Sequence, residues 1–282
     1  MSKLTDRSYW DQFHEEILVP KDITAEPAKK SLPRRLLGER LYSYRLSYHH
    51  HRLFNVILPK FLPQQKGLKV VELGSAPGRF LIDFKNRFGY DPYGLEYSEV
   101  GIQNNRGVFE QNGVDPDQVI PGDVLDPELI NQHRESFDIV MSMSFIEHFE
   151  NTAAIVQAHV DLLKPGGTLV IIAPNLSGLN RQMYGFFNPK DLAAHNLKIT
   201  NVSAFRELFH DLPVEPLFCD AYGVFSFQLY KPVPGTLRAK ILRIGKVMQQ
   251  GINIMHHALR GDTGRGLDGT CPYLLYVGRK KS

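Results

Sequence analysis

The sequence has few cysteines, no long apolar run and no strong excess of either charge. Its 282 residues include only two cysteines, Cys219 and Cys271, which lie far apart and lack the spacing of metal ligands. We therefore expect no disulfide framework and a reducing, cytoplasmic setting. No apolar run approaches the roughly 20 residues that span a bilayer, and the polar N-terminal residues predict no signal peptide. A net charge of +3 is too small to indicate a nucleic-acid partner.

Short apolar segments alternate with amphipathic ones from residue 68 onward. The segments that predict strands are Lys69–Leu73, Asp91–Glu96, Gln118–Pro121, Phe137–Ser142, Thr168–Ala173, Val214–Ala221 and Pro272–Arg279. Those that predict helices are Phe80–Phe88, Ser98–Asn112, Asp126–His133, Asn151–Leu163 and Thr200–Phe209. This alternation is typical of a parallel sheet with helices on both faces. Pro165-Gly166-Gly167 predicts a sharp turn between a helix that ends at Lys164 and the fifth strand.

We expect two parts in the chain, with residues 1–62 forming loops and capping helices and residues 63–282 forming the main domain. In the first part, Leu36–Leu62 has helical spacing of apolar residues. His49-His50-His51 lie within that segment. Successive side chains of a helix point about 100° apart, so these three imidazoles cannot converge on one metal ion. The main domain carries insertions at 176–199 and 231–270.

The insertion at 231–270 contains an amphipathic stripe. Its apolar residues recur at intervals of three and four, at Leu237, Ile241, Ile244, Met248, Ile252, Met255 and Leu259. Its polar side carries Arg238, Lys240, Arg243, Lys246 and Arg260. One interpretation is a helix that packs over the sheet edge with its basic face in water. The other is that residues 236–260 contact an acidic substrate or an anionic membrane surface.

The most informative stretch is residues 70–80. An apolar run ends at Glu72, and a turn containing Gly74 and Gly78 precedes a helical segment. Glycine allows the backbone to turn sharply and to approach a ligand, and the helix N-terminus offers free N–H groups. The dinucleotide fingerprint G-x-G-x-x-G does not match, because Ser75-Ala76-Pro77 puts no glycine two residues after Gly74.

Further segments follow this turn in a fixed order. Glu96 ends the second strand about 20 residues later, where nucleotide-binding folds use an acid to accept hydrogen bonds from ribose hydroxyls. The third strand ends in Gly122-Asp123-Val124, and the fourth runs from Phe137 into Ile146-Glu147-His148. Leu163-Lys164-Pro165-Gly166-Gly167 leads into the fifth strand, and Asn175 follows it.

Together these motifs, over residues 68–175, resemble those of the class I S-adenosylmethionine (AdoMet) methyltransferases, with Ala76 where that family has its middle glycine. The fourth-strand segment is similar to that of the small-molecule group related to ubiquinone-biosynthesis O-methyltransferases. The resemblance implies a Rossmann-like, doubly wound α/β sheet of seven strands, mostly parallel with an antiparallel last strand. It also implies S-adenosyl-L-methionine as cofactor. It assigns cofactor contacts to Glu72, Gly74, Ser75, Ala76, Gly78, Glu96, Tyr97, Asp123, Val124, Ser142 and Met143.

The activity that the resemblance implies is methyl transfer from AdoMet to a small-molecule acceptor, most simply a hydroxyl oxygen. His148 follows the strand that borders the donor, so it is either the general base or a structural residue that shapes the pocket. Substrate contacts are expected from Tyr44 and Tyr48 on the N-terminal helix and from Tyr184 and His195 in the first insertion. We expect no metal site.

Two other functions stay open. One is an RNA or other nucleic-acid methyltransferase, although Ser142-Met143-Ser144-Phe145 replaces the Asp/Asn-Pro-Pro-Tyr exit of amino-methylating DNA enzymes. The other is a non-catalytic AdoMet-binding subunit, since Glu96 and Asp123 predict binding but not turnover. We expect no nucleic-acid partner. The sequence leaves the identity of the acceptor and the oligomeric state undetermined.

Overall fold

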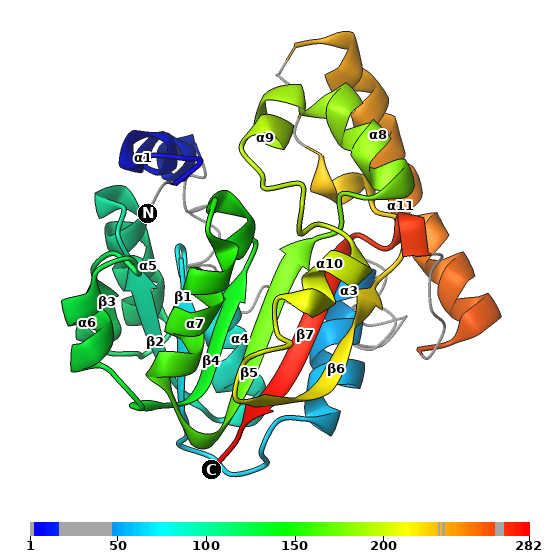
Figure 1. Cartoon of the computed structure of the whole chain (residues 1–282). Helices are drawn as coiled ribbons and strands as arrows, with labels where there is room; N and C mark the ends of the chain where they lie inside the picture. Colours follow the sequence, from blue (N-terminus) through cyan, green and yellow to red (C-terminus); the bar gives the residue numbers. More distant parts are fainter. Residues whose placement is uncertain (1–2, 17–46, 231, 233–234, 263–267) are drawn as a thin grey trace.

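The computed structural model describes residues 3–16, 47–230, 232, 235–262 and 268–282. Within these residues, a seven-stranded sheet of order β3-β2-β1-β4-β5-β7-β6 runs through the centre of the molecule (Figure 1). Its strands are β1 (Lys69–Leu73), β2 (Asp91–Glu96), β3 (Val119–Pro121), β4 (Phe137–Met143), β5 (Leu163–Pro174), β6 (Val214–Tyr222) and β7 (Tyr273–Lys280).

The last strand, β7, lies antiparallel to both of its neighbours, β5 and β6. The pairings among β1 to β5 are all parallel. This confirms the doubly wound, Rossmann-like sheet that the sequence predicts, with its single antiparallel strand at the end of the chain.

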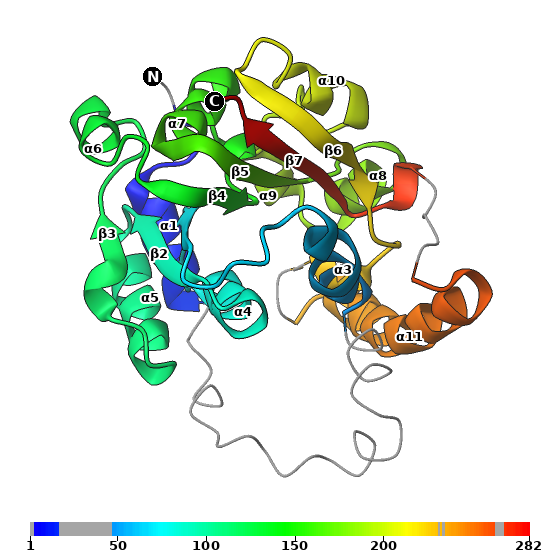
Figure 2. The ribbon, with the colours of Figure 1, turned by 90° about the horizontal axis from the view of Figure 1, so that it is seen from below.

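Helices cover both faces of the sheet, as Figure 2 shows from below. The helices on one face are α3 (Tyr48–Arg52), α4 (Arg79–Phe88) and α5 (Glu99–Gln111), and those on the other are α6 (Pro127–Gln132), α7 (Thr152–Leu162) and α10 (Val202–Glu207). Adjacent strand residues point to opposite faces. Val70 therefore joins the apolar cluster on the α4 side, and Val71 joins the cluster on the α7 side. Both faces are buried, which explains why apolar residues predominate in β1 and β4 without alternating with polar ones.

Two predicted segments differ from the structure. Of the predicted helix Leu36–Leu62, the part up to residue 46 lies outside the described residues, and the remainder is α3 followed by a π-helical turn, Leu53–Ile57, and a 3-10 turn, Leu58–Lys60. The prediction of a turn before the fifth strand is wrong in its boundaries. The helix ends at Leu162 and β5 begins at Leu163, which pairs with Phe137. Residues 164–167 form an irregularity inside the strand, with Gly166 at φ +74°.

The remaining helices lie at the carboxyl ends of the parallel strands. In Figure 1, α1 (Arg7–Glu16) lies on one side above the sheet, and α8 (Gly178–Phe187), α9 (Pro189–Ala193) and α11 (Leu237–Arg260) lie on the other. Short 3-10 turns are η4 (Pro116–Gln118), η5 (Ile146–His148), η6 (Phe227–Leu229) and η7 (Asp268–Thr270).

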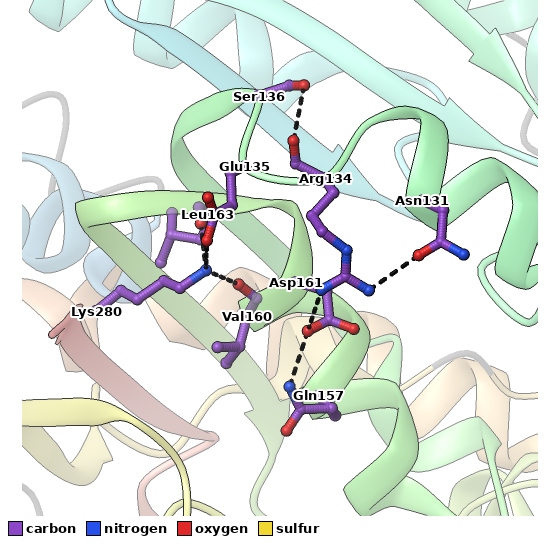
Figure 3. Close-up of polar contacts among 9 residues, drawn as sticks. All are labelled: Asn131, Arg134, Glu135, Ser136, Gln157, Val160, Asp161, Leu163 and Lys280. Atoms are coloured by element: carbon purple, nitrogen blue, oxygen red, sulfur yellow. Dashed lines mark hydrogen bonds and ion pairs between the residues drawn. The ribbon is translucent and has the colours of Figure 1, made fainter. Parts of the chain in front are cut away.

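Polar contacts fasten the opposite end of the sheet (Figure 3). The Lys280 ammonium donates to the carbonyl oxygens of Val160 and Leu163, at 3.0 and 2.7 Å, and to the Glu135 carboxylate at 3.0 Å. Asp161, beside them, accepts from Gln157 at 2.9 Å and pairs with Arg134. The ammonium thus binds two carbonyl oxygens at the junction between the end of α7 and the start of β5. The end of β7 is thereby tied to α7, away from the cavity described next.

Candidate active site

A cavity of about 340 Å³ opens at the carboxyl ends of strands β1 to β5. This is the crevice where open α/β sheets bind ligands, and its volume lies in the range of small-molecule sites. Strand-end residues that line it include Gly74, Glu96, Asp123, Met143 and Pro174. Residues of α1 and of the preceding segment close one side, and α8 and η6 contribute to another.

The turn after β1 depends on its two glycines. Gly74 has φ +69° and Gly78 has φ +88°, in the left-handed region that favours glycine. A Cβ at Gly74 would overlap the ring of Phe145, and one at Gly78 would overlap the side-chain amide of Asn105. Gly78 is also the residue that precedes α4, so the turn of residues 74–78 leads directly into the helix.

Glu96 is held by three backbone donors at the end of β2. Its carboxylate accepts from the N–H groups of Tyr97 and Ser98, at 3.0 and 2.9 Å, and of Ala76 at 3.2 Å. Burial raises the pKa of Glu96, and the three hydrogen bonds oppose that rise. The carboxylate is thus oriented by two loops at once, and it lines the cavity.

Glu72 lies two residues before Gly74 and is buried. Its Oε2 has no hydrogen-bond partner among the described residues. Burial, assisted by the charge of Glu96, raises the pKa of Glu72 well above its ordinary value. An unsatisfied buried carboxyl oxygen is costly, so this atom is suited to a ligand that brings a donor or a positive charge.

Asp123, at the end of β3, already has protein partners on both oxygens. One oxygen accepts from the N–H of Leu125 at 3.0 Å, and the other pairs with the ammonium of Lys3. That ammonium also lies 3.9 Å from the centre of the Tyr97 ring. The N-terminal segment therefore contacts the place where the sequence predicts the adenine of the cofactor.

His148 ends η5, directly after β4, and is buried at the cavity wall. Its Nδ1 lies 3.0 Å from the carbonyl oxygen of Ala194. A carbonyl only accepts, so Nδ1 carries the proton and Nε2 keeps its lone pair. Burial, with the neighbouring His195, lowers the pKa of His148 to about 3. The imidazole is therefore neutral at physiological pH.

Three other groups surround His148. The ring of His195 lies 4.7 Å away and the edge-on ring of Trp10 lies 4.9 Å away, between ring centres. The carboxyl of Glu147, fully buried, comes within 3.8 Å of His148 Nε2. Burial raises the pKa of Glu147 to about 8, against the effect of nearby backbone N–H groups.

The structure gathers most of the predicted site residues around the cavity. Those on its lining are Gly74, Ala76, Glu96, Tyr97, Asp123, Val124, Met143, His148, Tyr184 and His195. Those that lie behind the lining are Glu72, Ser75, Gly78 and Ser142. Ser75 Oγ, for example, accepts from the Asn105 amide at 2.6 Å and so supports the turn.

Of the two tyrosines that the sequence predicts as substrate contacts on the N-terminal helix, only Tyr48 belongs to the described residues, and it does not line the cavity. Tyr44 lies outside the described residues. Tyr48 is buried away from the cavity lining, where its hydroxyl donates to the carbonyl of Gly261 at 2.9 Å and its ring packs on His256. The prediction of Tyr48 as a substrate contact is therefore wrong, and Tyr48 is a packing residue beneath α11.

The sequence reasoning missed the contribution of the N-terminal segment. Lys3, Thr5, Tyr9, Trp10, Phe13 and His14 all line the cavity. The segment is tied to the η5 region by a bridge between Lys3 and Phe149 and by the Leu4 N–H, which donates to the His148 carbonyl at 2.9 Å. In the sequence, this segment is marked by a cluster of aromatic residues around the single tryptophan. Such a cluster matches no motif and does not by itself predict a binding site.

The fold and the strand-end cavity define a class I methyltransferase. The sequence pattern of a family described as a methyltransferase domain matches residues 44–212, more than half of the chain, and the chain belongs to that family. Its methyl donor is AdoMet.

Curated relatives match only parts of the chain. A tRNA U34 carboxymethyltransferase of Desulfotalea psychrophila is 29% identical over 136 residues, which cover 48% of this chain and 41% of that protein. A ubiquinone biosynthesis O-methyltransferase of Shewanella sp. (strain ANA-3) is 26% identical over 181 residues, covering 61% of this chain and 71% of the relative. The first alignment thus spans less than half of the relative's length.

Solved structures share the fold at low identity. Phosphoethanolamine N-methyltransferase 2 of Haemonchus contortus, solved with S-adenosyl-L-methionine, gives a TM-score of 0.53 at 16% identity and covers 90% of this chain and 60% of that one. A SAM-dependent methyltransferase of Archaeoglobus fulgidus gives 0.51 at 16% identity, covering 88% and 97%. These likenesses support the fold over most of the chain.

Proposed function

We propose that the protein transfers the methyl group of AdoMet to a hydroxyl oxygen of a small, largely apolar acceptor. One observation carries the proposal. A single cavity contains both the oriented carboxylate of Glu96 at the end of β2 and the neutral imidazole of His148 after β4. Only β1 separates these strands, so the two groups start from positions about 10 Å apart along the sheet edge.

The residues present fit the cofactor. The Glu96 carboxylate accepts hydrogen bonds from the ribose hydroxyls. Glu72, whose Oε2 has no hydrogen-bond partner among the described residues, lies behind the cavity lining and is assigned to the cofactor through the sequence motif alone. Asp123 and Val124 bound the adenine position, and Met143 lines the part of the cavity assigned to the methionine, with Ser142 buried behind it. Binding adenine at Asp123 competes with Lys3 for the same carboxylate.

The chemistry requires alignment more than covalent assistance. The acceptor oxygen attacks the methyl carbon in line with the departing sulfur, and the electron pair of the broken C–S bond stays on sulfur. Positioning of the two partners can contribute about 7–11 kcal/mol. The hydroxyl proton must also leave, and we assign activation of that hydroxyl to His148 and its neighbours.

The acceptor end of the cavity is aromatic. Trp10, Phe13, Phe149 and Tyr184 line it together with the two histidines. Such a lining favours a flat apolar molecule over a phosphate-rich one. A nucleic-acid acceptor is the alternative that the tRNA-modifying relative keeps open. Its recognition would require basic groups for the phosphates, but Lys3 is the one lysine or arginine among the described residues that line the cavity.

The test combines binding and turnover. We expect Glu96→Gln to weaken AdoMet binding at least about tenfold in calorimetry, because one charged acceptor is lost. His148→Ala should retain AdoMet binding but lower kcat for a hydroxyl acceptor by about 10²-fold. The measurement is transfer of a labelled methyl group to a panel of phenols and other alcohols. AdoMet binding without transfer to any acceptor would instead indicate a non-catalytic subunit.

We propose further that α11 places the protein on an anionic membrane surface. No helix in the described part of the chain has the length and apolarity needed to cross a bilayer. However, α11 exposes a row of large apolar side chains, with Leu237, Val247 and Leu259 more than 70% exposed. Its 24 residues include five lysines and arginines and no acid. This combination is typical of helices that lie in the interface of anionic lipid.

A further inference from the structure

Three potential metal ligands converge beside the aromatic end of the cavity. Glu147, His148 and His195 each offer one ligand atom, and these atoms lie within 4.8 Å of one another. The first two come from η5 after β4, whereas His195 comes from the segment that follows α9. His148 and His195 line the cavity, and Glu147 is buried directly beside them.

The orientation of His148 is that of a ligand. Its Nδ1–H donates to the Ala194 carbonyl, at 3.0 Å, so the unprotonated Nε2 is directed to the side where Glu147 Oε1 lies 3.8 Å away. Metal-binding histidines are commonly fixed in this way, with the second ring nitrogen donating to a backbone carbonyl. The peptide that holds His148 is adjacent to His195, so one backbone segment positions both imidazoles.

The environment of Glu147 independently indicates a bound cation. Its side chain is fully buried, and neither carboxyl oxygen has a partner at hydrogen-bond geometry. Among the residues that the structure describes, no lysine or arginine forms an ion pair with it, and His148 is its one ion-pair neighbour. Ionising a buried carboxyl group with no cation beside it is strongly unfavourable. A bound cation would remove that cost.

We propose that Glu147, His148 and His195 bind one divalent transition-metal ion, and that this ion receives the acceptor oxygen. Two imidazoles and one carboxylate form a ligand set of catalytic metal sites, which keep positions open for water or substrate. Ligand atoms bind such an ion at about 2.1 Å, so the cluster contracts by side-chain rotation when it is occupied.

This inference rests on the proposed function, since it specifies how the hydroxyl is activated. The ion withdraws charge from the bound hydroxyl, which releases its proton to solvent. The oxygen lone pair then forms the bond to the methyl carbon. The C–S bonding pair returns to sulfur, giving a methyl ether and S-adenosylhomocysteine.

The experiment is a Co²⁺ titration of the full-length, EDTA-treated protein, followed by visible absorption, with bound metal counted by elemental analysis. We expect one equivalent per chain. Glu147→Gln and His195→Ala should each weaken Co²⁺ binding by more than about tenfold, the lower range seen even for outer-shell changes. Tyr184→Phe, which lines the same cavity without donating a ligand atom to this cluster, is the matched control and should bind like the parent protein.

AdoMet binding by calorimetry, measured on every variant, reports whether the fold and the cofactor site persist. A protein that binds AdoMet but takes up no stoichiometric ion, or whose two ligand variants bind Co²⁺ as tightly as the parent, overturns the metal site. If EDTA-treated protein still methylates a hydroxyl acceptor at the full rate, the metal site fails while the proposed function stands. If the ion binds stoichiometrically but no hydroxyl is methylated, the proposed function fails and the assigned role of the ion fails with it.

Discussion

Two buried histidines, His148 and His159, share a tautomer but differ in what surrounds them. His159 Nδ1 donates to the carbonyl of Ile155 within α7 at 2.8 Å, much as His148 Nδ1 donates to Ala194. Burial lowers the pKa of His159 to about 4, and its Nε2 has no partner among the described residues. His148 instead directs Nε2 toward titratable neighbours at a cavity wall. With the same tautomer, His159 is a packing residue inside α7, whereas His148 is the residue to which we assign activation of the acceptor.

His159 predicts sensitivity to acid. Its pKa drops from 6.5 in the unfolded chain to about 4 in the folded one, so protons bind the unfolded state first as pH falls. Its contribution to stability is complete above pH 6.5 and is lost as pH falls toward 4, by on the order of 3 kcal/mol. We expect the free energy of unfolding of His159→Gln, measured in urea, to fall less over this range than that of the parent protein. Parallel pH curves for the two proteins would contradict the assignment.

At the scale of elements, α1 is the least expected part of the site. Besides the contacts of Lys3 and Leu4, Asp11 accepts from the Ser98 hydroxyl at 2.5 Å and the His14 carbonyl accepts from the Asn104 amide at 3.2 Å. The helix therefore lies along the start of α5 and covers the cavity. It brings the ring of Trp10 against His148. Helix α1 is thus held in place by its contacts with α5 and with the ring of His148.

We expect Trp10→Ala to open the acceptor end while leaving the ribose contacts in place. The KM for an apolar acceptor should rise about tenfold, which corresponds to about 1.4 kcal/mol of lost transition-state binding if kcat is unchanged. AdoMet affinity should change much less. Arg7→Ala, an exposed change on the same helix, is the matched control. Equal effects of the two variants on KM would show that Trp10 does not contact the acceptor.

At the scale of the whole molecule, the sheet was predictable because its signals are local. The bounds of β1 and β2 agree with the predicted strands, since each is a short segment between turn residues that ends in the motif position of its acid or glycine turn. The fifth strand was predicted to start too late. Pro165-Gly166-Gly167 is a turn signal in sequence, but Leu163 pairs with Phe137 before it. A bulge and a turn share the same residue types, and only the partner strand distinguishes them.

The site was predictable where motifs follow strands and unpredictable where distant segments meet. Glu96 and His148 directly follow strand ends, so their positions in the cavity follow from the topology. Trp10 reaches His148 through a bridge between residues near the N-terminus and Phe149. His195 returns to Glu147 after α7, β5, α8 and α9. Neither spacing carries a periodic signal, so the sequence alone does not predict that these side chains meet.

Helix α11 packs against residues that also line the cavity. Its buried Leu242 packs with Phe187 and Tyr230, and Tyr184 and Leu229, which line the cavity, pack against the same cluster. The buried side of the helix is fixed by Gln249, which accepts from the Phe227 N–H at 2.9 Å. The exposed apolar row of α11 is therefore connected to the acceptor end through one apolar cluster.

The exposed face of α11 predicts binding to anionic membranes. We expect the full-length protein to float with vesicles that contain phosphatidylglycerol. It should float much less with phosphatidylcholine alone or at high salt, because screening weakens the attraction of the basic residues. Replacing Ile244 and Val247 with serine removes two apolar side chains that are 64% and 73% exposed, so flotation should decrease severalfold. Gln250→Ser on the same helix is the control, since it removes no apolar surface. Flotation that is equal for the two variants, or equal with neutral and anionic vesicles, would show that α11 does not dock on an anionic bilayer.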